Sequence, residues 1–155
     1  MEVGIHANMV DQRTDKIGSE LRDLFDILCK RLKGSYGGTI EHLWIDFELV
    51  RSHAKSDGKA RYPFRFAKRV SGHSSFGLPP SPDYHNVGHF SVLPDFPHLL
   101  SISKDEVIPY CLNLIYQELL VLKTKEKKLG GFNSELFRKR FSNECEKLGY
   151  TLNSN

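Results

Sequence analysis

Hydrophobic residues recur at helical spacing in three segments of the chain. In residues 11–33, large aliphatic and aromatic side chains follow one another at intervals of three and four, with charged residues between them. This spacing predicts an amphipathic helix. Residues 103–129 are apolar over a wider arc, and Ser103 with Glu106 forms a capping-box sequence at the start, so we expect the central core helix there. The same spacing over residues 133–148 predicts a last helix.

Two segments between these helices alternate with a period of two. Apolar and polar residues alternate in residues 39–53 and again in residues 61–70, which predicts two β-strands. Asp57-Gly58 lies between them and favours a tight hairpin turn. We therefore expect the two strands to pair antiparallel. With the turn centred there, the opposed residues would be Leu49 with Phe66, Ile45 with Val70, Asp46 with Arg69 and Val50 with Arg65.

The rest of the chain completes a small α+β domain. Residues 71–88 are rich in proline, glycine and serine without an apolar period, and predict a long exposed loop. A third short strand is expected at residues 89–93. We expect a loose leader at residues 1–10, a single domain over residues 11–150 and a tail at residues 151–155. The predicted order is helix, three strands and two helices, with a small antiparallel sheet packed against helices on one face.

Composition narrows the class of protein. A chain of 155 residues is long enough to form one hydrophobic core without disulfides or a structural metal. The three cysteines are odd in number, and each falls on the apolar face of a predicted helix, which favours free thiols in a reducing compartment. The chain begins without a secretory signal pattern and has no apolar run of the ~20 residues that a membrane span needs. We expect a cytoplasmic protein that does not contact a membrane and needs no cofactor.

Charge is unevenly distributed along the sequence. The net charge is +3, but residues 51–73 carry +6, residues 123–140 carry +5, and the remainder carries −8. Arginines recur every fourth residue between residues 61 and 69, with aromatic residues between them. This pattern resembles a nucleic-acid platform, but a period of two places the aromatic and basic side chains on opposite faces of a strand. Nucleic acid is therefore a less favoured partner than protein.

Two histidines lie close together in the segment from residue 82 to residue 92. A metal site at His85 and His89 is disfavoured, because four residues of strand separate two imidazoles by ~13 Å. Metal-free acid–base chemistry on a phosphodiester is the alternative, with the two histidines exchanging protons and Tyr84 and Arg65 assisting. A helix followed by a short antiparallel sheet also looks like small ribonuclease toxins of the barnase and RelE kind. The predicted catalytic residues of this alternative are His85, His89, Tyr84 and Arg65.

Trp44 is the single tryptophan and is the strongest candidate for a binding residue. Alternation places it on the outward face of its strand, beside Asp46 and Glu48. An exposed tryptophan flanked by carboxylates is typical of an interface hot spot that faces a basic partner. The residues expected at the binding surface are Trp44, Asp46, Glu48, Arg65, Arg69 and His85.

The segments 44–48, 84–92 and 95–96 resemble small bacterial immunity proteins, which neutralise contact-dependent inhibition toxins or other polymorphic toxins. The resemblance implies a non-enzymatic protein that binds a cognate toxin domain, often a nuclease, and blocks its active site. Inhibitors of nucleases are commonly acidic, and the net charge of +3 departs from that pattern. From the resemblance we expect a protein-binding module that neutralises a toxin. A ribonuclease-type enzyme is the alternative.

Overall fold

The computed structural model describes residues 1–9, 15–49, 62–72, 83–123 and 130–153, and of these it describes only the backbone at residues 8–9, 15, 48–49 and 62–65. The elements in chain order are β1 (Glu2–Met9), α1 (Asp15–Leu32), β2 (His42–Leu49), β3 (Tyr62–Val70), β4 (Tyr84–Val92), α2 (Phe96–Ser101), α3 (Lys104–Leu122) and α4 (Ser134–Lys147).

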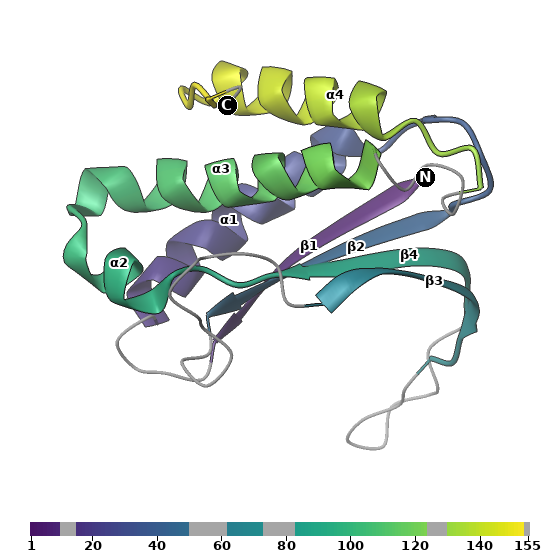
Figure 1. Cartoon of the computed structure of the whole chain (residues 1–155), viewed down its shortest axis with the longest axis horizontal. Helices are drawn as coiled ribbons and strands as arrows, with labels where there is room; N and C mark the ends of the chain where they lie inside the picture. Colours follow the sequence, from purple (N-terminus) through teal and green to yellow (C-terminus); the bar gives the residue numbers. More distant parts are fainter. Residues whose placement is uncertain (10–14, 50–61, 73–82, 124–129, 154–155) are drawn as a thin grey trace.

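The predicted α+β domain is confirmed, but the sheet is mixed rather than antiparallel. The strand order is β1-β2-β4-β3, with β1, β2 and β4 parallel and β3 antiparallel to β4. The described helices lie on one face of this sheet, as expected (Figure 1). Helix α1 packs on β1 and α3 packs on β4, and α4 contacts both of these helices.

The prediction of a loose leader is wrong, because Glu2–Met9 forms the edge strand β1. Val3, Ile5 and Ala7 are buried and alternate with more exposed residues, so this short segment follows the period of two that the sequence analysis did not weigh. The amide of Ile5 donates to the sulfur of Cys29 at 3.1 Å. This contact ties the outer edge of β1 to α1.

The predicted hairpin between the second and third strands is also wrong. β4 lies between β2 and β3, and β2 pairs with β4 in parallel. Phe66 is therefore opposite Gly88 instead of Leu49, and it is exposed. The turn at Asp57-Gly58 lies outside the described residues. Side-chain alternation, by contrast, is confirmed in β2, where Leu43, Ile45 and Phe47 are fully buried.

Strand β4 begins earlier than the sequence predicted. It runs from Tyr84 to Val92, so residues 84–88 belong to the sheet and not to the expected loop, of which residues 73–82 lie outside the description. Asn86 adopts a φ of 51°, a left-handed conformation that asparagine tolerates better than most residues. The loop was predicted because residues 71–88 are rich in proline, glycine and serine and lack an apolar period.

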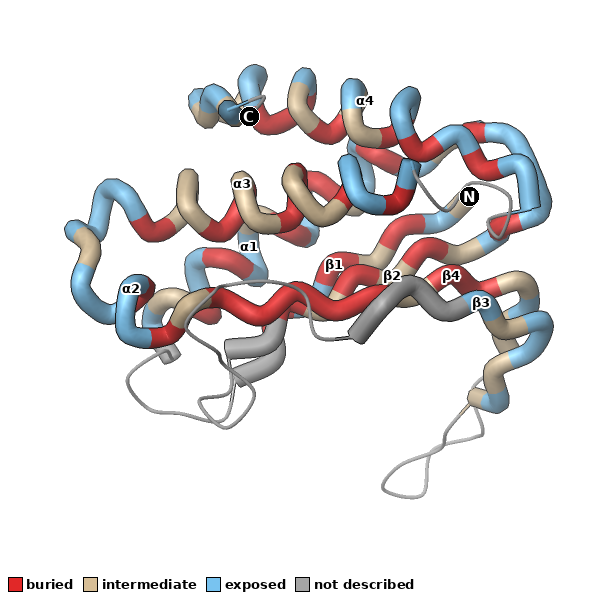
Figure 2. The backbone as a smooth tube through the Cα atoms, viewed as in Figure 1, coloured by how far each residue is buried: buried red, intermediate tan, exposed pale blue. Residues whose placement is uncertain are grey.

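The hydrophobic core lies between the sheet and the helices (Figure 2). It contains Phe25 of α1 and Phe47 of β2, with ring centroids 6.3 Å apart. At one end, Tyr36 packs edge-on against Phe137 of α4 at 5.0 Å. The capping box at the start of α3 is confirmed. The short helix α2, which Asp95 caps, was not predicted from the sequence.

Candidate functional site

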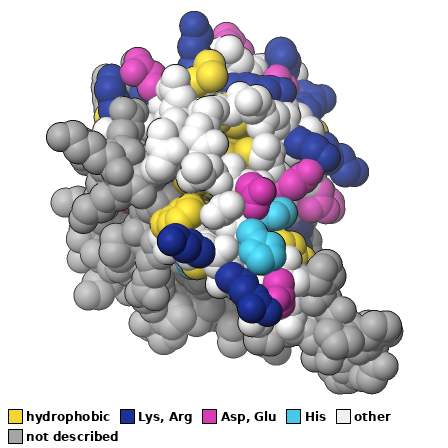
Figure 3. Space-filling view, turned by 90° about the vertical axis from the view of Figure 1, so that its right-hand side faces the viewer, with side chains coloured by type: hydrophobic (Ala, Val, Ile, Leu, Met, Phe, Trp, Pro, Cys, Tyr) yellow, Lys and Arg dark blue, Asp and Glu magenta, His cyan; other side chains and the backbone are white. Residues whose placement is uncertain are grey.

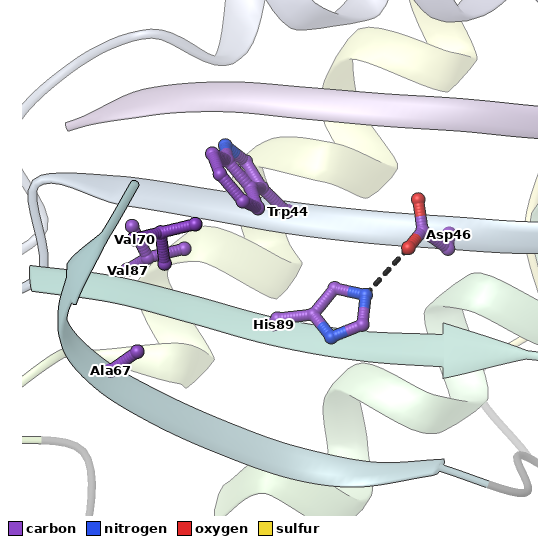
Figure 4. A pocket seen from close by; sticks show the side chains of 6 residues that line it. All are labelled: Trp44, Asp46, Ala67, Val70, Val87 and His89. Carbon is purple, nitrogen blue, oxygen red and sulfur yellow. Dashed lines mark hydrogen bonds and ion pairs between the residues drawn. The ribbon is translucent and has the colours of Figure 1, made fainter. Parts of the chain in front are cut away.

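The face of the sheet opposite the helices carries a pocket of about 360 Å³. β2 and β4 form its floor, and the curled end of β3 forms its side (Figure 4). No described helix covers this face (Figure 1). The lining residues are Trp44, Asp46, Ala67, Val70, Val87 and His89.

His89 and Asp46 form a close pair at one end of the pocket. The Nε2 atom of His89 lies 2.6 Å from Oδ2 of Asp46, and the two side chains are 31% and 25% exposed. In the parallel pairing, His89 is opposite Trp44 and Asp46 is opposite Ser91, so the pair is a diagonal contact between β2 and β4. A carboxylate hydrogen-bonded to an imidazole fixes the orientation of the ring.

Aromatic side chains pack around Trp44 at the other end of the pocket. Tyr84 packs edge-on against Trp44 and against His42, with ring centroids 5.2 Å apart in each case. Tyr84 and Val87 are three residues apart, so a regular strand would place them on opposite faces. The left-handed backbone of Asn86 changes the alternation between them. Both side chains therefore contribute to the same face as Trp44.

Arg69 and Asp83 form an ion pair beside this face. The Nε atom of Arg69 donates to Oδ2 of Asp83 at 2.6 Å, and the amide of Gly72 donates to Oδ1 of Asp83 at 3.2 Å. The hydrogen bond from Arg69 holds the pKa of the Asp83 carboxyl below its usual range. The predicted pairing of Arg69 with Asp46 is wrong, because β4 lies between the two strands.

The structure brings together only part of the predicted site. Trp44 and Asp46 lie in the pocket with His89. His85 is exposed, is opposite Arg69 and is not among the residues that line the pocket. The side chains of Glu48 and Arg65 lie outside the description, although the backbone of Arg65 is opposite that of His89.

The aliphatic walls of the pocket were not predicted from the sequence. Val70 was expected in the core opposite Ile45, and Val87 was placed in a loop. Both positions depend on the pairing of β4 with its neighbours, which local alternation does not reveal.

Neither a cluster of three metal-ligating side chains nor a membrane-spanning helix is found among the described residues. Within the ranges listed for the fold, no group of three histidine, cysteine or carboxylate side chains converges on a point that could hold an ion. In the same part of the chain, no helix is long and apolar enough to cross a membrane.

Comparisons with protein-family models, with curated proteins and with solved structures find no match to this chain.

Proposed function

We propose that this protein binds another protein through the uncovered face of its sheet, with Trp44 at the centre of the contact. The observation that carries the proposal is a half-buried tryptophan beside a pocket on a face without a described helix. Tryptophan is enriched among the residues that dominate binding energy in interfaces. Tyr84 packs against the indole ring, and a side chain already held in place loses less conformational entropy on binding.

The partner that we propose is a toxin domain. The support is the resemblance of segments 44–48, 84–92 and 95–96 to immunity proteins. A cytoplasmic location belongs to the same proposal and is supported by the three free cysteines, which are typical of a reducing compartment.

The charges beside the pocket favour protein over nucleic acid as the partner. Arg69 is paired with Asp83, so its positive charge is partly compensated. Figure 3 shows acidic, basic and histidine side chains close together on one end of the molecule. A nucleic-acid surface typically presents an excess of unpaired positive charge.

A comparison of three forms of the protein tests this function. Immobilised wild type, Trp44→Ala and Leu136→Ala would be used to capture proteins from the native cell, followed by mass spectrometry. Leu136 is a matched control because it is an exposed apolar residue on α4, 47% exposed and away from the sheet. We expect a specific protein bound by wild type and Leu136→Ala but not by Trp44→Ala. Equal capture by all three forms, or capture of RNA alone, would contradict the proposal.

An acid–base enzyme is the second candidate, and the His89–Asp46 pair is the observation that favours it. A histidine oriented by a carboxylate is a common general base. The role proposed for two histidines is weakened, since only His89 lines the pocket. Cleavage of single-stranded RNA by the wild type, lost in His89→Ala and kept in His85→Ala, would support this candidate over binding.

A further inference from the structure

The end of the pocket at His89 and Asp46 presents hydrogen-bond acceptors. An ionised carboxylate can only accept, so Nε2 of His89 carries the proton that is shared with Asp46; when the ring is neutral, its Nδ1 atom is an acceptor. Figure 4 shows the indole nitrogen of Trp44 on the side of β1, away from His89. In the part of the chain that the structure describes, no group donates to Nδ1 or to the second oxygen of Asp46.

These acceptors constrain what can cover the pocket. An acceptor that is buried without a donor loses the hydrogen bond that water gave it, which is unfavourable. A purely apolar group from a partner would leave the second oxygen of Asp46, and Nδ1 of a neutral His89, without a donor. With the ring neutral, the group that enters must therefore bring at least two donors.

Electrostatics at this end favours a cation. With a neutral imidazole, the pair carries the single negative charge of Asp46. On the neighbouring strand, the guanidinium of Arg69 is engaged by Asp83 instead. An anionic ligand would be repelled by the carboxylate, whereas a cation would gain a charge-assisted hydrogen bond.

The remaining walls suit a flat group on an aliphatic stem. Trp44, Ala67, Val70 and Val87 supply an aromatic ring and short aliphatic side chains. A volume of about 360 Å³ is at the lower end of the range for ligand sites, roughly 300–1,000 Å³, and is large enough for one long side chain. A guanidinium is planar, is weakly hydrated, carries five N–H donors and stacks on aromatic rings. An ammonium group has the charge but not the flat surface.

We propose that this pocket receives an arginine side chain of the protein partner, with the guanidinium donating to Asp46 and His89 and the stem packed against Trp44 and the valines. The inference rests on the proposed binding function, because it names the group through which the partner is recognised. It requires the partner to present an exposed arginine at the contact.

The test uses small probes and the fluorescence of Trp44, which is the only tryptophan in the chain. N-acetyl-argininamide and N-acetyl-citrullinamide would be titrated into the full chain. The two probes have nearly the same shape, but the urea group of citrulline is neutral and has fewer donors. We expect a saturable change with the arginine probe and affinity at least about ten-fold weaker for citrulline, since a hydrogen bond to a charged group contributes about 1.5–3 kcal/mol.

Variants show whether the pocket is the site of this binding. Asp46→Asn should weaken the arginine probe by about ten-fold or more, because it removes the charge and nearly preserves the shape. Glu135→Gln is the matched control, since it removes an exposed carboxylate on α4 that pairs with Lys123, and it should bind as the wild type does. Ala67→Leu fills the pocket without changing its polar groups and should also abolish binding. Circular dichroism would establish that each variant is folded.

Several outcomes would overturn the inference. These are equal responses to the two probes, unchanged affinity in folded Asp46→Asn, or saturable binding of p-cresol in place of the arginine probe, which would assign the pocket to an aromatic side chain. If partner capture depends on Trp44 but no arginine probe binds, the inference fails and the binding function stands. If capture does not depend on Trp44, the binding function itself fails.

Discussion

Replacement of Gly38 by alanine should destabilise the protein strongly, because this residue lies where two chain connections meet. The amide of Thr39 donates to the carbonyl oxygen of Gly130 at 3.1 Å, and the amide of Asn133 donates to that of Tyr36 at 2.7 Å. These bonds join the connection between α1 and β2 to the connection between α3 and α4. Any group added between them must separate the two backbones.

The expected loss follows from the position of the added methyl group. Gly38 has a φ of +69°, and a Cβ would lie 2.6 Å from the carbonyl carbon of Gly131, with Gly130 O and Phe132 N also in conflict. The left-handed conformation costs about 1–2 kcal/mol for an L-residue. Separating the backbones weakens two hydrogen bonds worth about 0.5–1.5 kcal/mol each. The free energy of unfolding should therefore fall by about 2–5 kcal/mol.

Gly149→Ala is the control for backbone strain alone. Gly149 has a φ of +91°, and an added Cβ would meet nothing within 4 Å, so this variant should lose only about 1–2 kcal/mol. Urea unfolding followed by far-ultraviolet circular dichroism would measure both losses. If the two variants lose the same stability, the steric conflict between the connections is not real and the argument is refuted.

Three other measurements test local features of the structure. In Arg69→Gln, the carboxyl pKa of Asp83 should rise toward its ordinary value when followed by NMR titration; because the folded pKa is the lower one, the ion pair stabilises the wild type above the unfolded pKa, and this contribution is lost as the pH falls through the folded pKa. Tyr36→Phe should cost about 0.5–1.5 kcal/mol in urea unfolding, since the hydroxyl donates to the carbonyl oxygen of Leu32 at 2.6 Å. Burial raises the pKa of the Cys111 thiol, so iodoacetamide should modify this residue only after unfolding.

The faces of the regular elements could be predicted from the sequence, because they depend on local period. The alternation in β2 correctly separated Leu43, Ile45 and Phe47 from Trp44 and Asp46. Capping chemistry correctly located the start of α3. Both features involve residues that are near neighbours in the chain.

Strand pairing could not be predicted in the same way. Asp57-Gly58 favoured a local hairpin, whereas the observed sheet inserts β4 between β2 and β3. In the observed arrangement, β2 pairs with a strand about forty residues later in the chain. The free energy gained by burying β4 between two neighbouring strands depends on residues far apart in sequence, so no local pattern indicates it. Because the predicted hairpin does not form, Asp46 and Arg69 are not on neighbouring strands.

The candidate site is a direct consequence of this long-range pairing. Parallel alignment of β2 with β4 places His89 opposite Trp44 and within reach of Asp46, although 43 residues separate the histidine from the aspartate. The left-handed residue Asn86 then allows Tyr84 to pack on the same indole ring. The sequence identified Trp44 and Asp46 as outward residues. The pairing of β2 with β4 brings them together with His89 in one pocket. A binding group selected by this pocket must therefore satisfy the aromatic ring and the carboxylate at the same time, and this is why a guanidinium suits it better than an apolar side chain does.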